Sequence, residues 1–593
     1  MTISLLVSTI AKLIQLVRDF MLNQRVMRHW QLPTSASPSQ LRSLGEYHPL
    51  LAAILWNRGW RDAAAVEQFL NIDWKQRHDP FLLHDMDRAV ERIKQAVAQQ
   101  QRVVVYGDFD TDGVTGVTLL MQLFKAFGLP VRPYIPKREG EGYGLNLAAI
   151  EKLHQEGLDL LVTVDCGISN VAEISRANEL GFDTIVLDHH QPPANLPPAY
   201  AVVDPKRSDC AYPFKGLCGV GVAFKLYEAL WRAGIQPNNL RARDILDVVA
   251  LGTIADMMPL TGENRVLVHF GLQAMNESQR PGLKALLRVA GVEQGKIDAS
   301  SVGFRLSPRI NAAGRLVDAR IAYSLLLAPD QAQADGFADQ LNSTNIERQA
   351  LTRDVQQAAR ELAQNSGQLD QRILVIVGED FHHGVVGLAA GKLAEEFARP
   401  VLVMGKEEDR SRGSARSIPG FNIVNALAEC ADLFEKYGGH AAAAGFTIAN
   451  EHIPELEQRL QAIANQQITD AMMVPQLPID AEATFDQLNL DTLAVLEKMA
   501  PFGLENPQPR FCSRRVTVIE ARGVGAENQH LRLRLQQGRH YQTAIGFNLG
   551  DWLAELPNGS QIDIVYTVGI NEWNGRSSVQ LTLVDLRLSE GQR

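Results

Sequence analysis

Short apolar runs alternate with stretches of helical spacing between residues 101 and 204. The runs are continuous rather than alternating and fall at Val103–Tyr106, Leu160–Val164, Thr184–Leu187 and Ala201–Val203. Such runs are typical of strands that are buried on both faces of a parallel sheet. The stretches between them have helical length and periodicity, at Val114–Phe127, Leu147–Glu156 and Val171–Leu180. This series predicts an α/β domain built on a parallel sheet.

Acidic residues and histidines directly follow three of these expected strands. In chain order they are Asp108, Asp110, Asp112, Asp165, Asp188, His189 and His190. In open α/β sheets, ligands bind outside the carboxyl ends of the strands, so we expect these side chains to converge. Carboxylates that lie so close together raise one another's pKa, and a pair of divalent cations relieves the repulsion. Mixed oxygen and nitrogen donors suit Mn²⁺, with Mg²⁺ as a substitute.

The stretch GDFDTDGVTG at 107–116 also resembles two other motifs. A calcium-binding EF-hand loop that began at Asp108 would need a glutamate at its twelfth position, where this chain has Leu119 in an apolar helical run. A phosphatase motif with Asp110 as nucleophile would need paired aspartates after a later strand, but the later strands end in Asp-Cys-Gly and Asp-His-His. Simple loop capping accounts for one aspartate, but not for three strand ends with a double histidine. We expect Gly113 to let the chain turn tightly into the next helix.

The rest of the chain predicts a second α/β domain and a β-barrel. Residues 211–330 are mostly helical in pattern, and a long polar helix is expected over 331–365. A second α/β unit begins with Ile373–Val377 and Val401–Met404. From about residue 475 several short strands, including HLRLRLQ at 530–536, suit a small OB-like barrel. The expected domains are 1–44 (an N-terminal extension or an over-extended start), 45–330 (the first α/β domain with its helices), 331–365 (connecting helix), 366–465 (the second α/β domain) and 470–590 (the OB-like barrel).

Composition favours a globular protein of a reducing compartment. Hydrophobic residues make up 46% of the 593 residues, and the formal net charge is −10, which argues against a basic coat for nucleic acid. The five cysteines show no CxxC spacing, so we expect a cytoplasmic protein without a disulfide framework. Residues 1–20 are apolar but contain Lys12 and Arg18, and they predict an amphipathic helix or an over-extended start rather than a signal peptide. No segment predicts a membrane span.

Several motifs occur in an order that identifies a family. They are GDFDTDG (107–113), VTVDCG (162–167), LDHH (187–190), ALGTIADMMPL (250–260), SPRINAAGR (307–315), FHHGVVGLAAGKLAE (381–395), GGHAAAAGF (438–446), PFGLENPQP (501–509) and NEWNG (571–575). The first four resemble the DHH phosphoesterase superfamily, and FHHGVVGLAAGKLAE and GGHAAAAGF resemble its DHHA1 domain. Taken together, over roughly residues 45–590, the motifs resemble the bacterial RecJ family of single-strand-specific exonucleases.

The resemblance implies two metal ions. Asp110 and Asp165 would hold one ion, with Asp108 in support. The implied ligands of the other ion are Asp112, Asp165, His189 and Asp256, so that Asp165 bridges the two. Two-metal chemistry of this kind lowers the pKa of a bound water and needs no covalent enzyme intermediate.

The resemblance also implies roles for other residues near the motifs. His190 would contact the scissile phosphate. Related pyrophosphatases have a histidine four residues before Asp110, where this chain has Tyr106, so the first ion would be held more loosely. His382 or His383 either assists from the second domain or is structural. Cys166 is expected to pack.

Arginines and small hydroxyl groups predict a site for a terminal phosphate. The candidate substrate-binding residues are Arg138, Arg309, Asn311, Arg315, Ser414, Arg416, Gly438, Gly439 and His440. The resemblance implies that Arg309, Ser414 and Arg416 read a 5′ phosphate, and SRGSARS at 411–417 is interpreted as a loop that contains glycine. The alternative for each arginine is a solvated surface charge. Alternation in HLRLRLQ places Arg532 and Arg534 outward, on a strand-binding face or simply on a polar surface.

The resemblance implies a Mn²⁺- or Mg²⁺-dependent exonuclease that degrades single-stranded DNA from 5′ to 3′ into 5′-mononucleotides, in repair and recombination. We expect a monomer, with a helicase and a single-strand-binding protein as candidate partners. Two alternatives stay open. One is a DHH/DHHA1 phosphodiesterase for short oligonucleotides or cyclic dinucleotides, and the other is an inactive nucleic-acid-binding scaffold on the same fold.

Overall fold

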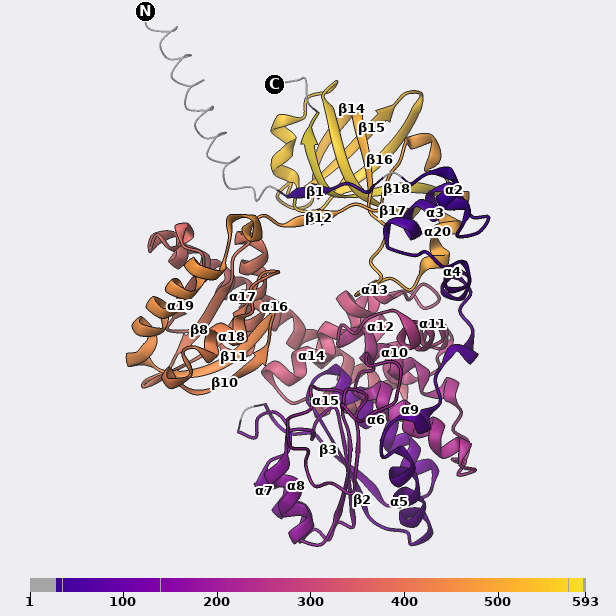
Figure 1. Ribbon diagram of the computed structural model, residues 1–593, viewed down its shortest axis with the longest axis vertical. Coiled ribbons are helices and arrows are strands. Elements are labelled where there is room, and N and C mark those ends of the chain that lie inside the picture. The colour runs from indigo at the N-terminus through magenta and orange to yellow at the C-terminus, as the bar shows by residue number, and fades with distance from the viewer. Residues whose placement is uncertain (1–27, 35, 139, 574, 590–593) are drawn as a thin grey trace, which may run out of the picture. The chain divides into compact units, whose positions relative to one another are not determined.

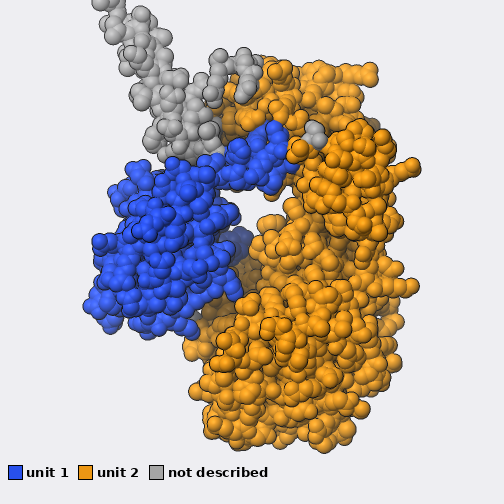
Figure 2. Space-filling model, in the orientation of Figure 1, with its two compact units in different colours: residues 1–32, 346–479 blue, residues 33–345, 480–593 orange. Residues whose placement is uncertain are grey.

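The computed structural model describes residues 28–34, 36–138, 140–573 and 575–589. The helix expected within residues 1–20 lies outside this described part. The chain divides into two compact units, which Figure 2 colours separately: unit 1 comprises residues 1–32 and 346–479, and unit 2 comprises residues 33–345 and 480–593. In the part that the structure describes, no helix is long and apolar enough to cross a membrane.

A five-stranded parallel sheet forms the centre of the α/β part of unit 2, as predicted. Its order is β3-β2-β4-β5-β6, with β2 at Val103–Gly107, β3 at Val131–Tyr134, β4 at Leu160–Val164, β5 at Asp183–Leu187 and β6 at Ala201–Val203. The sequence pattern missed β3, because this edge strand is only partly buried and contains Pro133. A proline lacks a donor for the sheet and is tolerated at an edge.

Helices cover both faces of this sheet (Figure 1). On one face, Val103 and Val105 share a core with α5 (Met86–Ala98), α6 (Thr111–Ala126) and α9 (Gly219–Arg232). On the other face, Val104 and Tyr106 pack with α7 (Leu147–Gln155) and α8 (Val171–Glu179). Almost all of α6 is buried, because α10 (Leu246–Ala255) and α9 pack around it. The carboxyl ends of β2, β4 and β5 are therefore held within a dense core.

Further helices complete this part of unit 2. They are α11 (Gly262–Glu277), α12 (Pro281–Ala290), α13 (Ala299–Ser301), a π-helical turn (Val302–Leu306), α14 (Ser307–Leu316) and α15 (Arg320–Leu326). The long helix α16 (Gln331–Asn365) has the bounds expected from its periodicity and runs from one unit into the other.

A closed five-stranded barrel follows residue 510, as predicted. Its strands are β14 (Phe511–Val524), β15 (His530–Gln537), β16 (His540–Gly546), β17 (Gln561–Trp573) and β18 (Arg576–Leu588), in the order β14-β15-β16-β18-β17, and β17 pairs back with β14. The short strand β13 (Ala481–Glu482) pairs in parallel with the start of β14, and α20 spans Leu490–Leu496. In β15, Leu531, Leu533 and Leu535 are buried whereas Arg532 and Arg534 are exposed, so the alternation has its predicted direction.

The N-terminal helices pack on the barrel. Leu51 and Leu55 of α3 (Pro49–Asn57) and Val66 of α4 (Ala63–Leu70) share one hydrophobic core with barrel residues such as Phe511 and Ile562. The short helix α2 spans Pro38–Arg42. The sequence pattern groups residues 45–70 with the catalytic domain instead, because periodicity shows that a helix has an apolar face but not which core receives it.

Unit 1 has a five-stranded sheet of order β10-β11-β9-β8-β7. Its elements are β7 (Leu374–Gly378), α17 (His383–Phe397), β8 (Val401–Lys406), β9 (Arg410–Arg416), α18 (Ile423–Ala428), β10 (Phe434–His440), β11 (Ala443–Ala449) and α19 (Ile453–Gln467), with a separate parallel pair β1 (His29–Gln31) and β12 (Gln476–Pro478). The interpretation of 411–417 as a loop was wrong, because residues 410–416 form β9. The buried side chains of Ser411 and Ala415 show the strand's inner face, a pattern that the polar neighbours hide in the sequence.

Candidate metal centre

The seven catalytic residues expected from sequence, five of them as metal ligands, lie together at the carboxyl edge of the parallel sheet. Asp108, Asp110 and Asp112 follow β2, Asp165 follows β4, His189 and His190 follow β5, and Asp256 caps the end of α10. Within the described residues, three groups have ligand atoms within 4.8 Å of one another: Asp108, Asp110 and Asp165; Asp112, His189 and Asp256; and Asp165, Asp188, His189 and His190. Because Asp165 and His189 each belong to two groups, the three form one continuous site.

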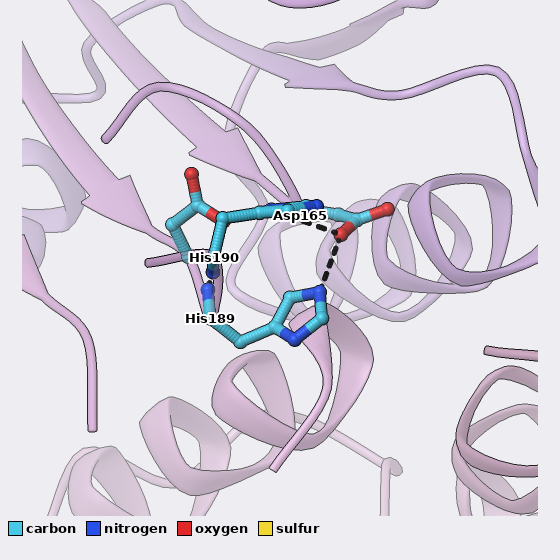
Figure 3. A group of neighbouring side chains, drawn as sticks. Asp165, His189 and His190 are labelled. Atoms are coloured by element: carbon cyan, nitrogen blue, oxygen red, sulfur yellow. Dashed lines mark hydrogen bonds and ion pairs between the residues drawn. The ribbon is translucent and has the colours of Figure 1, made fainter. Parts of the chain in front are cut away.

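His189 lies at the centre of the site and points toward Asp165 (Figure 3). Its Nε2 is 3.0 Å from Asp165 Oδ1, 3.6 Å from Asp256 Oδ2 and 3.8 Å from Asp112 Oδ2. The ring is buried. One imidazole nitrogen thus faces three carboxylates from three different segments, which is the arrangement of donors around a divalent cation.

Asp165 has an unusual backbone. Its φ is 61°, in the left-handed region, which residues with a Cβ seldom adopt. Its N–H is held by the carbonyl of Leu187, at 3.0 Å. Burial, followed by the charges of Asp112, Asp110 and Asp108, raises the pKa of Asp165 well above its usual range. Strain of this kind persists where the surrounding structure fixes the residue, and it concentrates at functional sites.

Asp112 and Asp256 repel each other. The two oxygens of Asp112 accept backbone N–H groups from Gly219, at 2.5 Å, and Val220, at 2.9 Å, at the start of α9. Although these donors favour the charged form, burial and the charge of Asp110 raise the pKa of Asp112 to about 6. Burial and the charge of Asp112 raise the pKa of Asp256 to about 9. The cluster is therefore unfavourable for its own carboxylates at neutral pH.

The donor set fits a pair of divalent cations. Oδ1 of Asp108 and Oδ2 of Asp256 are buried and accept no hydrogen bond from any residue that the structure describes. A buried carboxylate oxygen without a donor costs free energy unless a cation supplies the missing charge. Carboxylate oxygens with one imidazole nitrogen are ligands that Mn²⁺ accepts, and Mg²⁺ accepts the oxygens.

Within the site, Asp188 and Tyr143 both contact His190, an arrangement that was not predicted. Asp188 Oδ1 is 2.8 Å from His190 Nδ1 and also accepts the backbone N–H groups of both histidines. Burial alone would lower the pKa of His190, but the hydrogen bond to Asp188 raises it to about 9. The hydroxyl of Tyr143 lies 3.1 Å from His190 Nδ1. Asp188 was visible as the second letter of LDHH, but nothing in the sequence connects Tyr143 to this strand.

Asp204 is an acidic residue near this edge of the sheet that the sequence analysis missed. It follows β6, so the argument from strand ends could have found it. The residue is fully buried, and burial raises its pKa to about 7. Its Oδ1 accepts the N–H of Lys206, at 2.7 Å. Asp204 belongs to none of the three ligand groups found among the described residues.

Helix α14 places Asn311 against the metal-site loop. Asn311 Oδ1 accepts both the N–H and the hydroxyl of Thr111, each at 2.8 Å, and Thr111 lies between Asp110 and Asp112. Sequence reasoning assigns Asn311 to substrate, and the structure adds this support of the loop.

The predicted substrate-binding arginines of unit 2 lie on or near α14. Arg138 donates to the carbonyl of Gly314, at 2.9 Å, and its guanidinium lies 4.1 Å from the ring centre of Phe109. Arg309 donates to Asn342 Oδ1, at 3.0 Å, and Arg315 is half-buried further along α14. Their roles toward substrate stay predictions.

The remaining predicted substrate residues lie in unit 1. Ser414 and Arg416 are on β9, where Arg416 Nη1 donates to Ser414 Oγ at 3.0 Å. Burial lowers the pKa of Arg416, so this guanidinium is partly desolvated. Gly438, Gly439 and His440 end β10 and pair with β11. These five residues form a group within unit 1 that is separate in sequence and unit from the metal-site carboxylates.

The structure explains why tyrosine occupies position 106 and glycine position 113, which the sequence did not show. The hydroxyl of Tyr106 donates to the carbonyl of Gly144, at 3.0 Å, and its ring stacks on Tyr134. Tyr106 thus packs with Cys166 on the sheet face opposite α6. The prediction of a tight turn at Gly113 was wrong, since Gly113 lies inside α6. A Cβ at this position would lie 2.5 Å from the carbonyl oxygen of Asp108, so glycine is needed for the close approach of the two backbone segments.

Family models match three separate parts of the chain. The DHH family N-terminal domain matches residues 102–253, the DHHA1 domain matches 370–470 and the RecJ OB domain matches 479–585. The first match contains all of the metal-site residues except Asp256. The fold and the site therefore define a DHH phosphoesterase with a DHHA1 domain and an OB domain.

Individual relatives narrow this class. The chain is 38% identical over 546 residues to the single-stranded-DNA-specific exonuclease RecJ of Bacillus subtilis strain 168, and the match covers 92% of this chain and 68% of that protein. The crystal structure of RecJ in complex with Mn²⁺ from Thermus thermophilus matches with a TM-score of 0.81 and 31% identity, over 95% of this chain and 80% of that one. The Mg²⁺ complex from the same organism matches with a TM-score of 0.74 and 29% identity, over 95% and 79%. The chain belongs to the RecJ family, which confirms the resemblance seen in its motifs.

Proposed function

We propose that this chain is a metal-dependent exonuclease that hydrolyses the phosphodiester bonds of single-stranded DNA, in DNA repair and recombination. We further propose that it starts at the 5′ end and releases 5′-mononucleotides. The observation that carries the proposal is the continuous carboxylate and imidazole site centred on Asp165 and His189, in a chain of the RecJ family.

Two ions would be held by the residues of this site. Asp110 and Asp165 would bind the first, with Asp108 beside them, and the second would be bound by Asp112, Asp165, His189 and Asp256. Mn²⁺ or Mg²⁺ in such a pair supplies a water of lowered pKa and neutralises charge on the attacking and leaving oxygens. The buried oxygens of Asp108 and Asp256 without donors support this assignment.

His190 would act on the scissile phosphate. Its bond to Asp188 fixes the ring and favours the protonated imidazole at neutral pH, since its pKa is raised to about 9. A held imidazolium donates a charge-assisted hydrogen bond to a phosphate oxygen, and such bonds are about twice as strong as neutral ones. Tyr143 would help to hold the ring, because its hydroxyl lies 3.1 Å from His190 Nδ1.

The 5′ phosphate would be read by Arg309, Ser414 and Arg416. A guanidinium and a hydroxyl 3.0 Å apart, as in Arg416 and Ser414, can both donate to one phosphate group. Further substrate contacts are assigned to Arg138, Asn311, Arg315, Gly438, Gly439 and His440. His382 and His383, at the start of α17, keep both a substrate role and a structural one.

The barrel would bind the single-stranded DNA at nucleotides further from the scissile bond. A hollow of about 590 Å³ on its outer face is lined by Arg522, Arg532, Arg534 and Tyr541, among others. The guanidinium of Arg534 lies 5.4 Å from the ring centre of Tyr541. Arginines that follow the backbone and an aromatic ring for stacking suit single strands of any sequence.

The proposed division of labour follows the expected domains. The domain expected at 45–330 would catalyse, apart from α3 and α4, which pack on the barrel. Residues 366–465 would read the end of the strand and 470–590 would bind its body, with 331–365 as the connecting helix. We infer a cytoplasmic location from the five free, buried cysteines. We further propose that the protein is a monomer, with a helicase and a single-strand-binding protein as partners.

The test compares long single strands, duplexes and oligonucleotides of two to five residues, each labelled at the 5′ or the 3′ end, with Mn²⁺ and with chelator. Labelled mononucleotide should appear at once from 5′-labelled single strands and late from 3′-labelled ones. The variant Asp165→Ala should lose hydrolysis but keep DNA binding, because it removes the proposed bridge between the ions. The control is Asp354→Ala, which changes an exposed aspartate of α16.

Each alternative has its own outcome in this assay. Activity confined to the shortest oligonucleotides would favour a phosphodiesterase for such substrates. Binding without hydrolysis by the folded, Mn²⁺-loaded protein would favour a scaffold. Early release from the 3′ label would reverse the proposed polarity. Full turnover by Asp165→Ala would refute the metal assignment.

A further inference from the structure

The PFGLENPQP segment at 501–509 contacts the loop that follows a metal-site residue. The carbonyl of Leu504 accepts the backbone N–H of Leu260, at 2.9 Å. Leu260 lies only four residues after Asp256, and its side chain is 2% exposed. The segment that leads into the barrel strand β14 therefore touches the segment that carries Asp256.

The contact leaves no space for a side chain on the turn. A Cβ on Gly503 would lie 2.6 Å from Leu260 Cδ1 and 2.9 Å from Leu260 Cγ, distances that real Cβ atoms essentially never show. Leu260 cannot retreat easily, because it is packed in a small core with Val268 of α11 and Ala299 of α13. The turn and Leu260 thus fix each other's position.

The turn itself is rigid. Gly503 and Asn506 exchange backbone hydrogen bonds of 2.9 and 3.2 Å. The side chain of Asn506 is buried, and its Nδ2 donates to the carbonyls of Met499 and Pro501, each at 2.8 Å. Its Oδ1 accepts from Arg58, at 3.2 Å, and Arg58 also pairs with Asp480 at the start of the C-terminal domain.

Arg265 of α11 anchors the same segment from the catalytic side. The guanidinium is 3% exposed and donates to the carbonyls of Met499, at 2.6 Å, and Lys498, at 3.0 Å. It also lies 4.1 Å from the ring centre of Phe69. A buried cation that donates to backbone carbonyls holds the backbone in one place, because leaving it unpaired would be costly.

The loop between Asp256 and Leu260 is held elsewhere too. Met257 has a left-handed φ of 54°, and the carbonyl of Pro259 accepts from Asn264 Nδ2, at 3.1 Å. Asn264 Nδ2 also donates to the carbonyl of Gly216, at 2.6 Å, three residues before the N–H group that binds Asp112. A loop this short and fixed at both ends transmits a displacement of Leu260 to Asp256.

We propose that the Gly503–Asn506 turn is a positioning element for Asp256, and that it sets the affinity of the ion held by Asp112, His189 and Asp256. This inference rests on the proposed function, since it requires that ion. The C-terminal domain thereby acts on the metal centre through a backbone hydrogen bond and a packed leucine, in addition to any contact with the strand.

The test is a Mn²⁺ titration of full-length Gly503→Ala, followed by electron paramagnetic resonance. Gly569→Ala is the matched control, because Gly569 lies in barrel strand β17 and a Cβ there meets nothing within 4 Å. The variant Asp256→Asn identifies which class of bound Mn²⁺ belongs to the Asp256 site. We expect Gly503→Ala to weaken that class by about tenfold, the lower end of what residues supporting metal ligands contribute, and to leave the other class unchanged.

A second substitution, at Leu260, tests whether the effect of Gly503→Ala reaches Asp256 through that leucine. Replacing Leu260 with alanine removes the Cδ1 and Cγ atoms that the new methyl group would meet, so the double variant Gly503→Ala/Leu260→Ala should regain part of the lost affinity. At saturating Mn²⁺ the turnover of Gly503→Ala should return to that of the parent, because the ligands themselves are intact. If Gly503→Ala does not fold, Asn506→Asp, which removes the two donors to Met499 and Pro501, provides the same titration.

The outcomes separate this inference from the proposed function. If the parent binds no Mn²⁺ that Asp256→Asn removes, the proposed metal site fails. If the parent binds it and Gly503→Ala, or Asn506→Asp in its place, binds equally well, the positioning role is refuted while the metal site stands. Equal weakening of both classes, or no recovery in the double variant, would also refute a route through Leu260.

Discussion

Removal of one charge from the metal centre should stabilise the metal-free protein. Asp256→Asn keeps the shape of the side chain but cannot ionise. In the parent, Asp256 Oδ2 is buried without a hydrogen-bond donor among the described residues, and burial with the charge of Asp112 raises its pKa to about 9. An unfolded aspartate has a pKa of about 3.9. Folding without metal must therefore either bury the charge or take up a proton.

The geometry gives the size of the effect. The ligand atoms of Asp112, His189 and Asp256 lie within 4.8 Å of one another. Two charges at that separation repel by roughly 3.5 kcal/mol at an effective dielectric constant of about 20. Because folding raises the pKa of Asp256, the contribution of this group to stability is fully present below about pH 4 and is lost as the pH rises toward 9, by at most about 1.4 kcal/mol per pH unit. The Asp256 side chain is a quarter exposed, so solvent screening reduces the gain of the variant to about 2 kcal/mol at pH 8.

The assay is thermal unfolding in chelator between pH 5.5 and 8.5. At pH 8, Asp256→Asn should melt roughly 2 °C above the parent, and this difference should shrink steadily as the pH falls. Added Mn²⁺ should raise the melting temperature of the parent more than that of the variant, because binding to the folded state alone stabilises it. Asp354→Asn, which changes an exposed residue of α16, should follow the parent throughout.

Two results would refute the reasoning. The first is a variant that is no more stable than the parent at pH 8 in chelator, which would mean that the carboxylates do not repel in the folded state. The second is a difference that grows as the pH falls, because that sign requires a lowered pKa for Asp256 rather than a raised one.

Three further predictions concern substrate and proton. Arg416→Ala should reduce the preference for 5′-phosphorylated over 5′-hydroxyl single strands about tenfold or more, since a charge-assisted hydrogen bond contributes about 1.5–3 kcal/mol. Initial rates on the two substrates measure this preference, and an unchanged preference would show that Arg416 does not bind the 5′ phosphate. Arg532→Ala and Arg534→Ala should each lower, by about one, the slope of log binding constant for single-stranded DNA against log salt concentration. Fluorescence anisotropy in chelator measures this slope, and variants with the slope of the parent would show that the DNA strand binds elsewhere. Asp188→Asn should lower the pKa of His190 from about 9 toward its usual range. The alkaline limb of the pH–rate profile should then move to lower pH, and an unchanged alkaline limb would show that it does not report the titration of His190.

The metal centre was predictable because its residues follow strands that the sequence marks clearly. A continuous apolar run such as Leu160–Val164 can be recognised alone, and parallel strands bring the residues after them to one edge. Asp165 and His189 were therefore expected to meet although 24 residues separate them. Asp256 was found only by resemblance. It lies at the end of a helix, and no general rule places helix ends at the edge of the sheet where the strand ends meet.

What could not be predicted depends on tertiary packing. Tyr143 reaches His190 from a loop whose path no local pattern specifies. Helices α3 and α4 have ordinary amphipathic patterns, yet they complete the core of a barrel more than 400 residues later in the chain. Gly113 was correctly noticed but for the wrong reason, because the backbone of Asp108 that it must approach is visible only in the structure.

The distribution of support around the carboxylates indicates which part of the site depends most on metal. Asp112 accepts two backbone N–H groups at the start of α9, so protein dipoles balance part of its charge. Asp256 has no such donor for its buried Oδ2 among the described residues, and it caps the C-terminal end of α10, where a short loop begins. Its position is then set by what holds that loop, which is Asn264 on one side and the Gly503–Asn506 turn on the other. The same residue therefore carries both an expected gain in metal-free stability and the proposed route by which the C-terminal domain reaches the metal centre.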